Sequence, residues 1–193
     1  MVNVEPGPVV STRRYHAVRF YENVKSLSQI VAAFLSQGFA AGDPGVVLAT
    51  PSHRAAILRE LVAGGVDIVA VQRSGDLMLL DAEGALSTFM TDGNPDAQKF
   101  TISMREAIEC ACHGRADCTV RMYGEMVDVL WKDGNRQAAI RLEILWNQLA
   151  NGQAFSLLCG YAMGNFYKDA NFAHICGHHT HVVAADGTAT AVA

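Results

Sequence analysis

A regular alternation of short apolar segments with longer amphipathic segments is the feature that most constrains the fold of this chain. The segments 45–50 (GVVLAT) and 154–161 are continuous apolar runs of strand length, which are typical of strands covered on both faces. The longer segments place apolar residues three and four positions apart, as in a helix with one buried face. Because alternating strands and helices build parallel sheets with crossover helices, the sequence predicts an α/β fold, a three-layer sandwich with a mostly parallel sheet.

The boundaries of the elements follow from their end signals. The predicted strands span residues 16–21, 45–50, 66–72, 77–80, 118–123 and 154–161. The predicted helices run from Ser26 to Gly38, from Ser52 to Gly64, and over 81–90, 95–113, 125–131 and 135–150. Serine side chains accept hydrogen bonds from the free amides of a helix start, and glycine suits a helix end. Residues 1–14 and 184–193 show no periodicity, so we expect flexible tails around a single domain at 15–183.

The composition narrows the class of protein. Hydrophobic residues make up 50% of the 193 residues and charged residues 18%, which indicates a globular chain. The net charge is −4 and no Lys/Arg block stands out, so neither a nucleic-acid nor a membrane partner is expected. The longest apolar stretch, 155–167, is too short to cross a bilayer, and the first residues lack a signal-peptide pattern. Five cysteines without framework spacing predict free thiols in a cytoplasmic protein.

Polar side chains follow the predicted strands at the points where those strands end. Parallel α/β sheets bind ligands outside the carboxyl ends of their strands, so these side chains are the candidate ligand-binding residues. They are Tyr21, Glu22, His53, Asp81, Arg121, Glu125 and Tyr161. We expect Glu125 at the centre, because Gly124 permits a sharp turn and a helix start favours a carboxylate. The alternative is that these groups only satisfy one another, with Glu125 paired to Arg121 and Asp81 capping its helix.

No motif of a common catalytic or nucleotide-binding site occurs in the chain. The sequence lacks G-x-x-x-x-G-K-[ST], G-x-S-x-G and H-E-x-x-H. Lys25 and Ser26 match the last two letters of a phosphate loop, but the glycines that let a backbone wrap a phosphate are missing. Glu22 would also repel phosphate. We therefore expect a protein that is not an enzyme and has no cofactor.

A cluster of histidines and one cysteine near the C-terminus leaves two interpretations open. Zinc or another transition metal suits such ligands, but a structural site needs four, usually from two separated pairs. Cys112 and His113 are the only other pair of this kind. The other interpretation is a polar chain end that packs one histidine against the sheet, and the sequence assigns no metal. The cluster consists of His174, Cys176, His178, His179 and His181.

Eight short motifs, taken in order, resemble one known family. They are HAVRFYE (16–22), FLxxGFxxGD (34–43), ATxxH (49–53), LDA (80–82), RxYGEM (121–126), RLExLWN (141–147), LCxY (158–161) and ICxxHxHV (175–182). Their order resembles the MEDS family, the sensory domain of methanogens, methylotrophs and the regulator DcmR, over roughly residues 15–183. The resemblance implies a RecA/KaiC-like sheet that lacks a functional phosphate loop, whose place would be 22–26.

The resemblance also implies a function. Members of the family are regarded as signal-input domains, so we expect a non-catalytic domain that senses a small organic ligand such as a hydrocarbon derivative. It would signal through a partner such as a histidine kinase or a transcription regulator. Two alternatives remain: a protein–protein interaction module in a kinase or sigma-factor pathway without a ligand, and a degenerate ATPase relative that still binds nucleotide. RecA relatives often assemble, so a homo-oligomer is expected.

Overall fold

The computed structural model of the protein describes residues 15–165 and 172–192. A seven-stranded sheet forms its middle layer. The strand order is β3-β2-β6-β7-β1-β8-β9. All neighbours are parallel except the last pair, β8 and β9. The strands are β1 (His16–Tyr21), β2 (Gly45–Ala49), β3 (Leu77–Asp81), β6 (Val120–Gly124), β7 (Phe155–Ala162), β8 (His181–Val183) and β9 (Ala189–Ala191).

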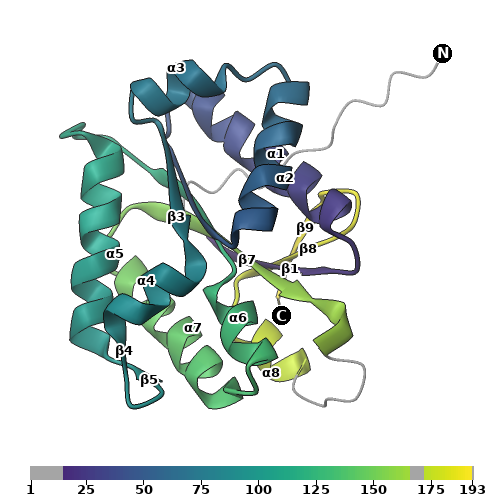
Figure 1. The fold of residues 1–193 in the computed structure, drawn as a ribbon, viewed down its shortest axis with the longest axis vertical. Coiled ribbons are helices and arrows are strands. Elements are labelled where there is room, and N and C mark those ends of the chain that lie inside the picture. The colour runs from purple at the N-terminus through teal and green to yellow at the C-terminus, as the bar shows by residue number, and fades with distance from the viewer. Residues whose placement is uncertain (1–14, 166–171, 193) are drawn as a thin grey trace.

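Helices cover both faces of this sheet (Figure 1). One face packs against α1 (Val24–Ala41) and α2 (Pro51–Ala63), with the short α3 (Ile68–Arg73) beside them. The other face packs against a larger group of helices. These are α4 (Ala82–Phe89), α5 (Ala97–Cys112), α6 (Met126–Lys132) and α7 (Arg136–Ala150). The remaining elements are the small hairpin β4 (Met90–Thr91) and β5 (Asn94–Pro95), the 3-10 turn η1 (Met163–Asn165) and α8 (Phe172–Cys176).

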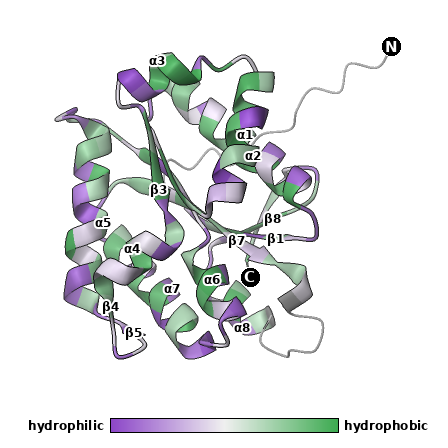
Figure 2. Cartoon of the chain, viewed as in Figure 1, coloured by the Kyte–Doolittle hydropathy of each residue, from purple (hydrophilic) through white to green (hydrophobic). Residues whose placement is uncertain are grey.

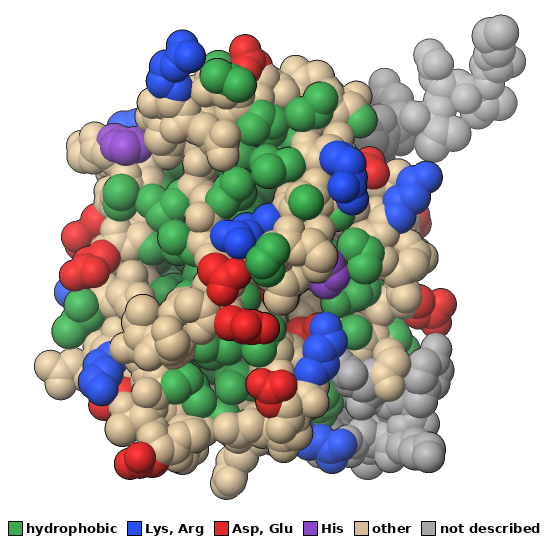
Figure 3. All heavy atoms as spheres, viewed as in Figure 1, with side chains coloured by type: hydrophobic (Ala, Val, Ile, Leu, Met, Phe, Trp, Pro, Cys, Tyr) green, Lys and Arg blue, Asp and Glu red, His purple; other side chains and the backbone are tan. Residues whose placement is uncertain are grey.

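The predicted fold class, a three-layer α/β sandwich with a mostly parallel sheet, is therefore confirmed. Each residue of β2 is buried, as its continuous apolar run required. In Figure 2 hydrophobic and hydrophilic residues alternate along α5, as in a helix with one buried face. Trp146, which the apolar stripe of α7 places inward, is 1% exposed and packs edge-on against Phe100. On the face of the molecule in Figure 3, Lys and Arg side chains are dispersed among acidic ones.

Two segments differ from the sequence prediction. The segment 66–72, predicted as a strand, instead contains α3, because the Asp67 carboxylate accepts a hydrogen bond from the Ala70 amide at 3.0 Å and caps a helix. The predicted tail at 184–193 contains β9, which pairs with β8. The predicted tail at 1–14 lies outside the described residues. Helix α1 runs through Gly38 and ends at Gly42, whose φ of 80° is one that glycine adopts without strain.

The cysteines also depart from the expectation of free thiols. Cys112 at the end of α5 and Cys118 just before β6 form a disulfide, with Cα atoms 5.7 Å apart. Six positions separate the two cysteines in the sequence, so the disulfide closes one short loop. Cys110, Cys159 and Cys176 are free. Among the described helices, none is both long enough and apolar enough to cross a membrane.

Candidate functional site

Glu125 stands where strand β6 ends and helix α6 begins, as predicted, and only 2% of it is exposed. Its Oε1 accepts a hydrogen bond from the backbone amide of Thr50, the residue that follows β2. Its Oε2 lies 2.5 Å from Nδ1 of His53 and accepts a hydrogen bond from the Tyr123 hydroxyl at 3.2 Å. The carboxylate thus joins the ends of two neighbouring strands through three partners.

A second carboxylate, Asp128, extends this cluster toward β1 and β7. Its Oδ2 accepts a hydrogen bond from the Tyr21 hydroxyl at 3.3 Å and lies 2.6 Å from Nζ of Lys132. Its Oδ1 accepts the Ala162 amide at 3.0 Å. The Tyr21 ring meets the His53 ring edge-on, with centroids 5.8 Å apart. Two hydrogen-bonded sets, one around Glu125 and one around Asp128, therefore meet through this ring contact at the carboxyl ends of four central strands. We call them together the edge cluster: Tyr21, Thr50, His53, Tyr123, Glu125, Asp128 and Lys132.

The environment lowers the pKa of one group of the edge cluster, Glu125, and raises the pKa values of two others, Tyr21 and Tyr123. Burial alone raises the pKa of Glu125, but the hydrogen bonds from His53 and the Thr50 amide outweigh it, and the pKa lies below its usual value of 4.5. Burial, followed by the nearby carboxylates, raises the pKa values of the Tyr21 and Tyr123 hydroxyls. The phenols therefore remain protonated donors, and Glu125 remains an ionised acceptor.

The structure brings together only part of the predicted set. Tyr21, His53 and Glu125 meet in the edge cluster, whereas Glu22 is exposed in the turn after β1. Asp81 caps α4 through the Gly84 amide at 2.8 Å and pairs with Arg54 at 3.3 Å. The alternative pairing of Glu125 with Arg121 is wrong, because Glu125 bonds Thr50, His53 and Tyr123 while Arg121 faces Asp43.

The last two predicted residues lie away from the edge cluster. Arg121 lies 3.6 Å from Asp43 and stacks over the Phe34 ring. Tyr161 donates its hydroxyl to Glu143 at 2.8 Å, on the face that α7 covers. Whether a ligand contacts any of these residues stays a prediction.

Sequence reasoning missed four members of the edge cluster: Thr50, Tyr123, Asp128 and Lys132, which pairs with Asp128 one helical turn before it. Thr50 contributes through its backbone amide, which leaves no trace in the sequence. Asp128 lies three residues after Glu125, the spacing that places two side chains on one helix face, and this signal was readable. Tyr123 and Met122 are successive residues of β6 and point to opposite faces of the sheet, and the sequence does not say which face each one occupies.

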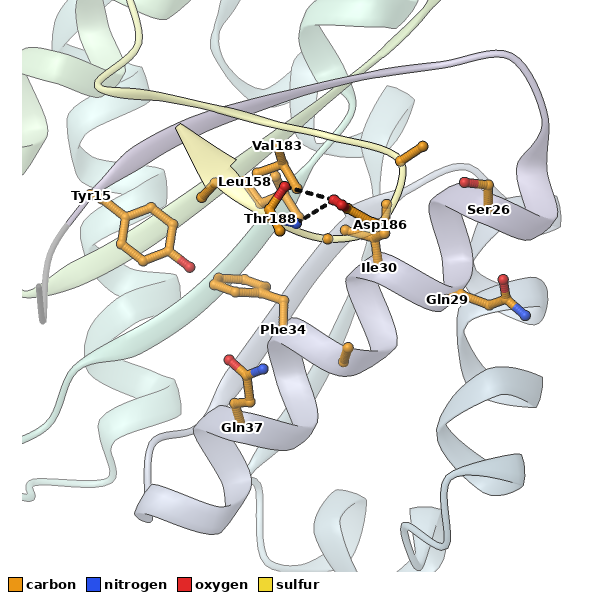
Figure 4. Close-up of a pocket in the computed structure, with 14 residues that line it drawn as sticks. Tyr15, Ser26, Gln29, Ile30, Phe34, Gln37, Leu158, Val183, Asp186 and Thr188 are labelled. Carbon is orange, nitrogen blue, oxygen red and sulfur yellow. Dashed lines mark hydrogen bonds between the residues drawn. The ribbon is translucent and has the colours of Figure 1, made fainter. Parts of the chain in front are cut away.

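A cavity of about 390 Å³ opens beside α1 (Figure 4). No residue of the edge cluster lines it. Its walls come from α1, from Leu158 of β7 and from the β8–β9 hairpin. Apolar side chains form much of the lining, with a few amide, hydroxyl and carboxylate groups among them. The lining residues are Tyr15, Ser26, Gln29, Ile30, Ala33, Phe34, Gln37, Leu158, Val183, Ala185, Asp186, Gly187, Thr188 and Ala189. None of the seven predicted site residues lines it.

The hairpin wall of this cavity is locally ordered. The Asp186 carboxylate accepts hydrogen bonds from the Thr188 amide at 2.9 Å and from the Thr188 hydroxyl at 2.6 Å, as Figure 4 shows. The Tyr15 and Phe34 rings meet edge-on at the opposite end, with centroids 6.1 Å apart. A second cavity, of about 540 Å³, lies along α7 and is lined more by amide and imidazole groups, including Asn147, Gln148 and His178.

Comparison with known proteins gives one family and one fold. The model of the MEDS family, described as "MEthanogen/methylotroph, DcmR Sensory domain", matches residues 15–180. A crystal structure of the KaiC-like protein PH0186 from the hyperthermophilic archaeon Pyrococcus horikoshii OT3 is similar over 86% of this chain and 70% of its own, with a TM-score of 0.58 and 11% identity. At that identity the likeness concerns the fold, and it confirms the KaiC/RecA-like sheet. No curated protein matches.

Proposed function

We propose that this chain, which belongs to the MEDS family of sensory domains, is a non-catalytic signal-input domain that binds a small organic ligand in the cavity beside α1. The observation that carries the proposal is the cavity itself. A volume of about 390 Å³, with apolar walls and few polar groups, is the usual form of a small-molecule site. Ile30, Phe34 and Val183 would contact an apolar body, while Gln29 and Gln37 would orient a polar end.

The edge cluster is less suited to a ligand than the cavity, because its carboxylates already have hydrogen-bond partners. Both oxygens of Glu125 are already bonded, to the Thr50 amide and to His53 and Tyr123. Both oxygens of Asp128 are likewise bonded, to Tyr21 and Lys132 and to the Ala162 amide. Because a ligand would have to replace these bonds, the cluster is better suited to holding strand ends together.

The start of α1 favours a domain that does not hydrolyse nucleotides. Only Glu22 and Asn23 separate β1 from α1, where a phosphate loop would need its glycines. The Asn23 side chain accepts the Ser26 amide at 2.7 Å, so a helix-start amide that would face a phosphate already has a partner. A signalling protein, such as a histidine kinase or a transcription regulator, would receive the output.

A ligand screen tests the proposal. Thermal unfolding is followed with short alcohols, carboxylic acids and halogenated hydrocarbons, and with ATP–Mg. At 100 times its Kd, a bound compound should raise Tm by roughly 5–10 °C. Ala33→Trp, which fills the cavity, should abolish the shift, whereas Ala40→Trp, on α1 outside the cavity, should keep it.

Other outcomes would point elsewhere. A shift with ATP–Mg accompanied by phosphate release would contradict the non-catalytic assignment. A shift that survives Ala33→Trp but disappears in Glu125→Gln would move the ligand to the edge cluster. Absence of any shift from the whole panel, with a partner protein captured by the same domain, would favour an interaction module.

A further inference from the structure

Four side chains with metal-ligating atoms meet inside the molecule, on the sheet face that α7 covers. They are His16 at the start of β1, Glu143 of α7, Cys159 of β7 and His179 after α8. None is more than 5% exposed. We propose that His16, Glu143, Cys159 and His179 form a closed four-ligand site for a divalent transition-metal ion, with Zn²⁺ the best match.

The distances suit a tetrahedral ion. One ligand atom from each side chain can be chosen so that all four lie within 4.8 Å of one another. The Nε2 of His16 lies 3.2 Å from Oε2 of Glu143 and 3.3 Å from Sγ of Cys159. The Nε2 of His179 lies 3.4 Å from Oε1 of Glu143. Zinc bonds of about 2.0–2.3 Å imply ligand separations of about 3.4 Å at tetrahedral angles, so little movement is needed.

The outer partners of the two histidines fix which nitrogen faces the site. The Nδ2 of Asn147 donates to the His178 carbonyl at 2.8 Å, so its Oδ1 faces Nδ1 of His16 at 2.9 Å. An amide oxygen only accepts, hence Nδ1 of His16 carries the proton. The Nδ1 of His179 likewise donates to the Ile175 carbonyl at 2.8 Å. Metal-binding histidines are held in this way, with the other nitrogen free for the ion.

His179 supplies an independent sign that something belongs between these groups. Its side chain is fully buried, and its Nε2 makes no hydrogen bond to any described residue. A proton or a cation between this nitrogen and the Glu143 oxygen is what makes so close an approach favourable. A divalent cation does so, and with the thiolate of Cys159 and the carboxylate of Glu143 it makes the site neutral.

The surroundings complete the site. The Tyr161 hydroxyl donates to Glu143 at 2.8 Å and so orients the carboxylate. The cavity along α7 is lined by His16, Asn147 and His178, so one of the four ligands borders a space with polar walls from which an ion could enter. Of the C-terminal cluster singled out in the sequence, only His179 belongs to the four.

Cobalt spectroscopy and metal analysis test the proposal on the untagged full chain. Protein purified from zinc-supplemented cells should hold about one zinc per chain, and X-ray absorption at the zinc edge should report one sulfur and three nitrogen or oxygen ligands. After chelation and reloading with Co²⁺, the intense visible bands of a tetrahedral ion should appear, with a thiolate-to-cobalt charge-transfer band. Cys159→Ser should remove that band, and Cys176→Ser, on the adjacent α8, should retain it.

A second variant covers the case in which Cys159→Ser does not fold. Asn147→Ala removes the group that orients His16 and should weaken Co²⁺ binding about 10–100-fold. Protein without zinc, or zinc without a sulfur ligand, would overturn the proposal. So would a charge-transfer band that survives in Cys159→Ser and is lost in Cys176→Ser, because the ion would then sit on the outer histidines.

Discussion

The Tyr123 hydroxyl lies against the backbone of Gly160 in the neighbouring strand, where a Cβ would come within 2.6 Å of it. Because Gly160 has no side chain, the Tyr123 hydroxyl has the space that it needs to reach Glu125. Gly160→Ala should lower the free energy of unfolding by about 1–3 kcal/mol, because a well-packed core tolerates overpacking poorly. Urea denaturation measures the change.

A matched variant serves as the control for Gly160→Ala. At Gly124 a Cβ would meet Leu157 at 3.8 Å, an ordinary contact, so Gly124→Ala should cost less. Adding Tyr123→Phe to Gly160→Ala removes the clashing atom and should recover part of the loss. Equal losses in the two alanine variants would refute the steric explanation.

Glu125 makes the stability of the fold depend on acid. Its pKa lies below 4.5 in the folded protein, so its contribution is complete above the unfolded pKa and is lost as pH falls through the folded one. Glu125→Gln should lower the unfolding free energy by about 1–3 kcal/mol at pH 7, where a buried charged partner is lost. The gap to the wild type should narrow on acidification below pH 4.5. Parallel stability curves for the two proteins would show that Glu125 does not carry this pH dependence.

At the scale of elements, the disulfide between α5 and the segment before β6 can be tested by thiol alkylation. Alkylation of the unfolded, unreduced protein should label three thiols, and five after reduction. Closing a loop of this length should stabilise the fold by about 2 kcal/mol on the chain-entropy account. Cys112→Ser should therefore lose that amount, whereas Cys110→Ser, an exposed neighbour, should not. Five labelled thiols without reductant would restore the original expectation.

Elements with strong local signals could be predicted, and those decided by side-chain capping or long-range pairing could not. A continuous apolar run such as Gly45–Ala49 predicts a buried strand from local sequence alone. The segment around α3 carries the same β-branched residues, yet the Asp67 cap makes it a helix. Strand β9 consists of small residues, and only its partner β8 makes it a strand.

For the whole molecule, the parallel sheet was predictable but the grouping of polar residues was not. Successive strand residues point to opposite faces, and a sequence does not state which face is which. Tyr161 therefore lies with Glu143 on the face that α7 covers, while Tyr21 lies on the opposite face, among side chains of α1 and α2. The cavity beside α1 depends on the β8–β9 hairpin, a segment without periodicity, so neither its place nor its lining could be predicted.

The hairpin connects the two proposed sites. His179 lies two residues before β8, and Val183, Asp186 and Thr188 of the same segment line the cavity. Thermodynamic reciprocity then applies: if a bound ion raises the ligand's affinity by some factor, the ligand raises the ion's affinity by the same factor. Coupling of this kind is typically 5–150-fold. Titrating one ligand into zinc-loaded and zinc-stripped protein measures the factor, and equal affinities would separate the two sites. Where zinc raises the affinity, the domain would respond to an organic compound at a lower concentration when zinc is also available, as a coincidence detector does.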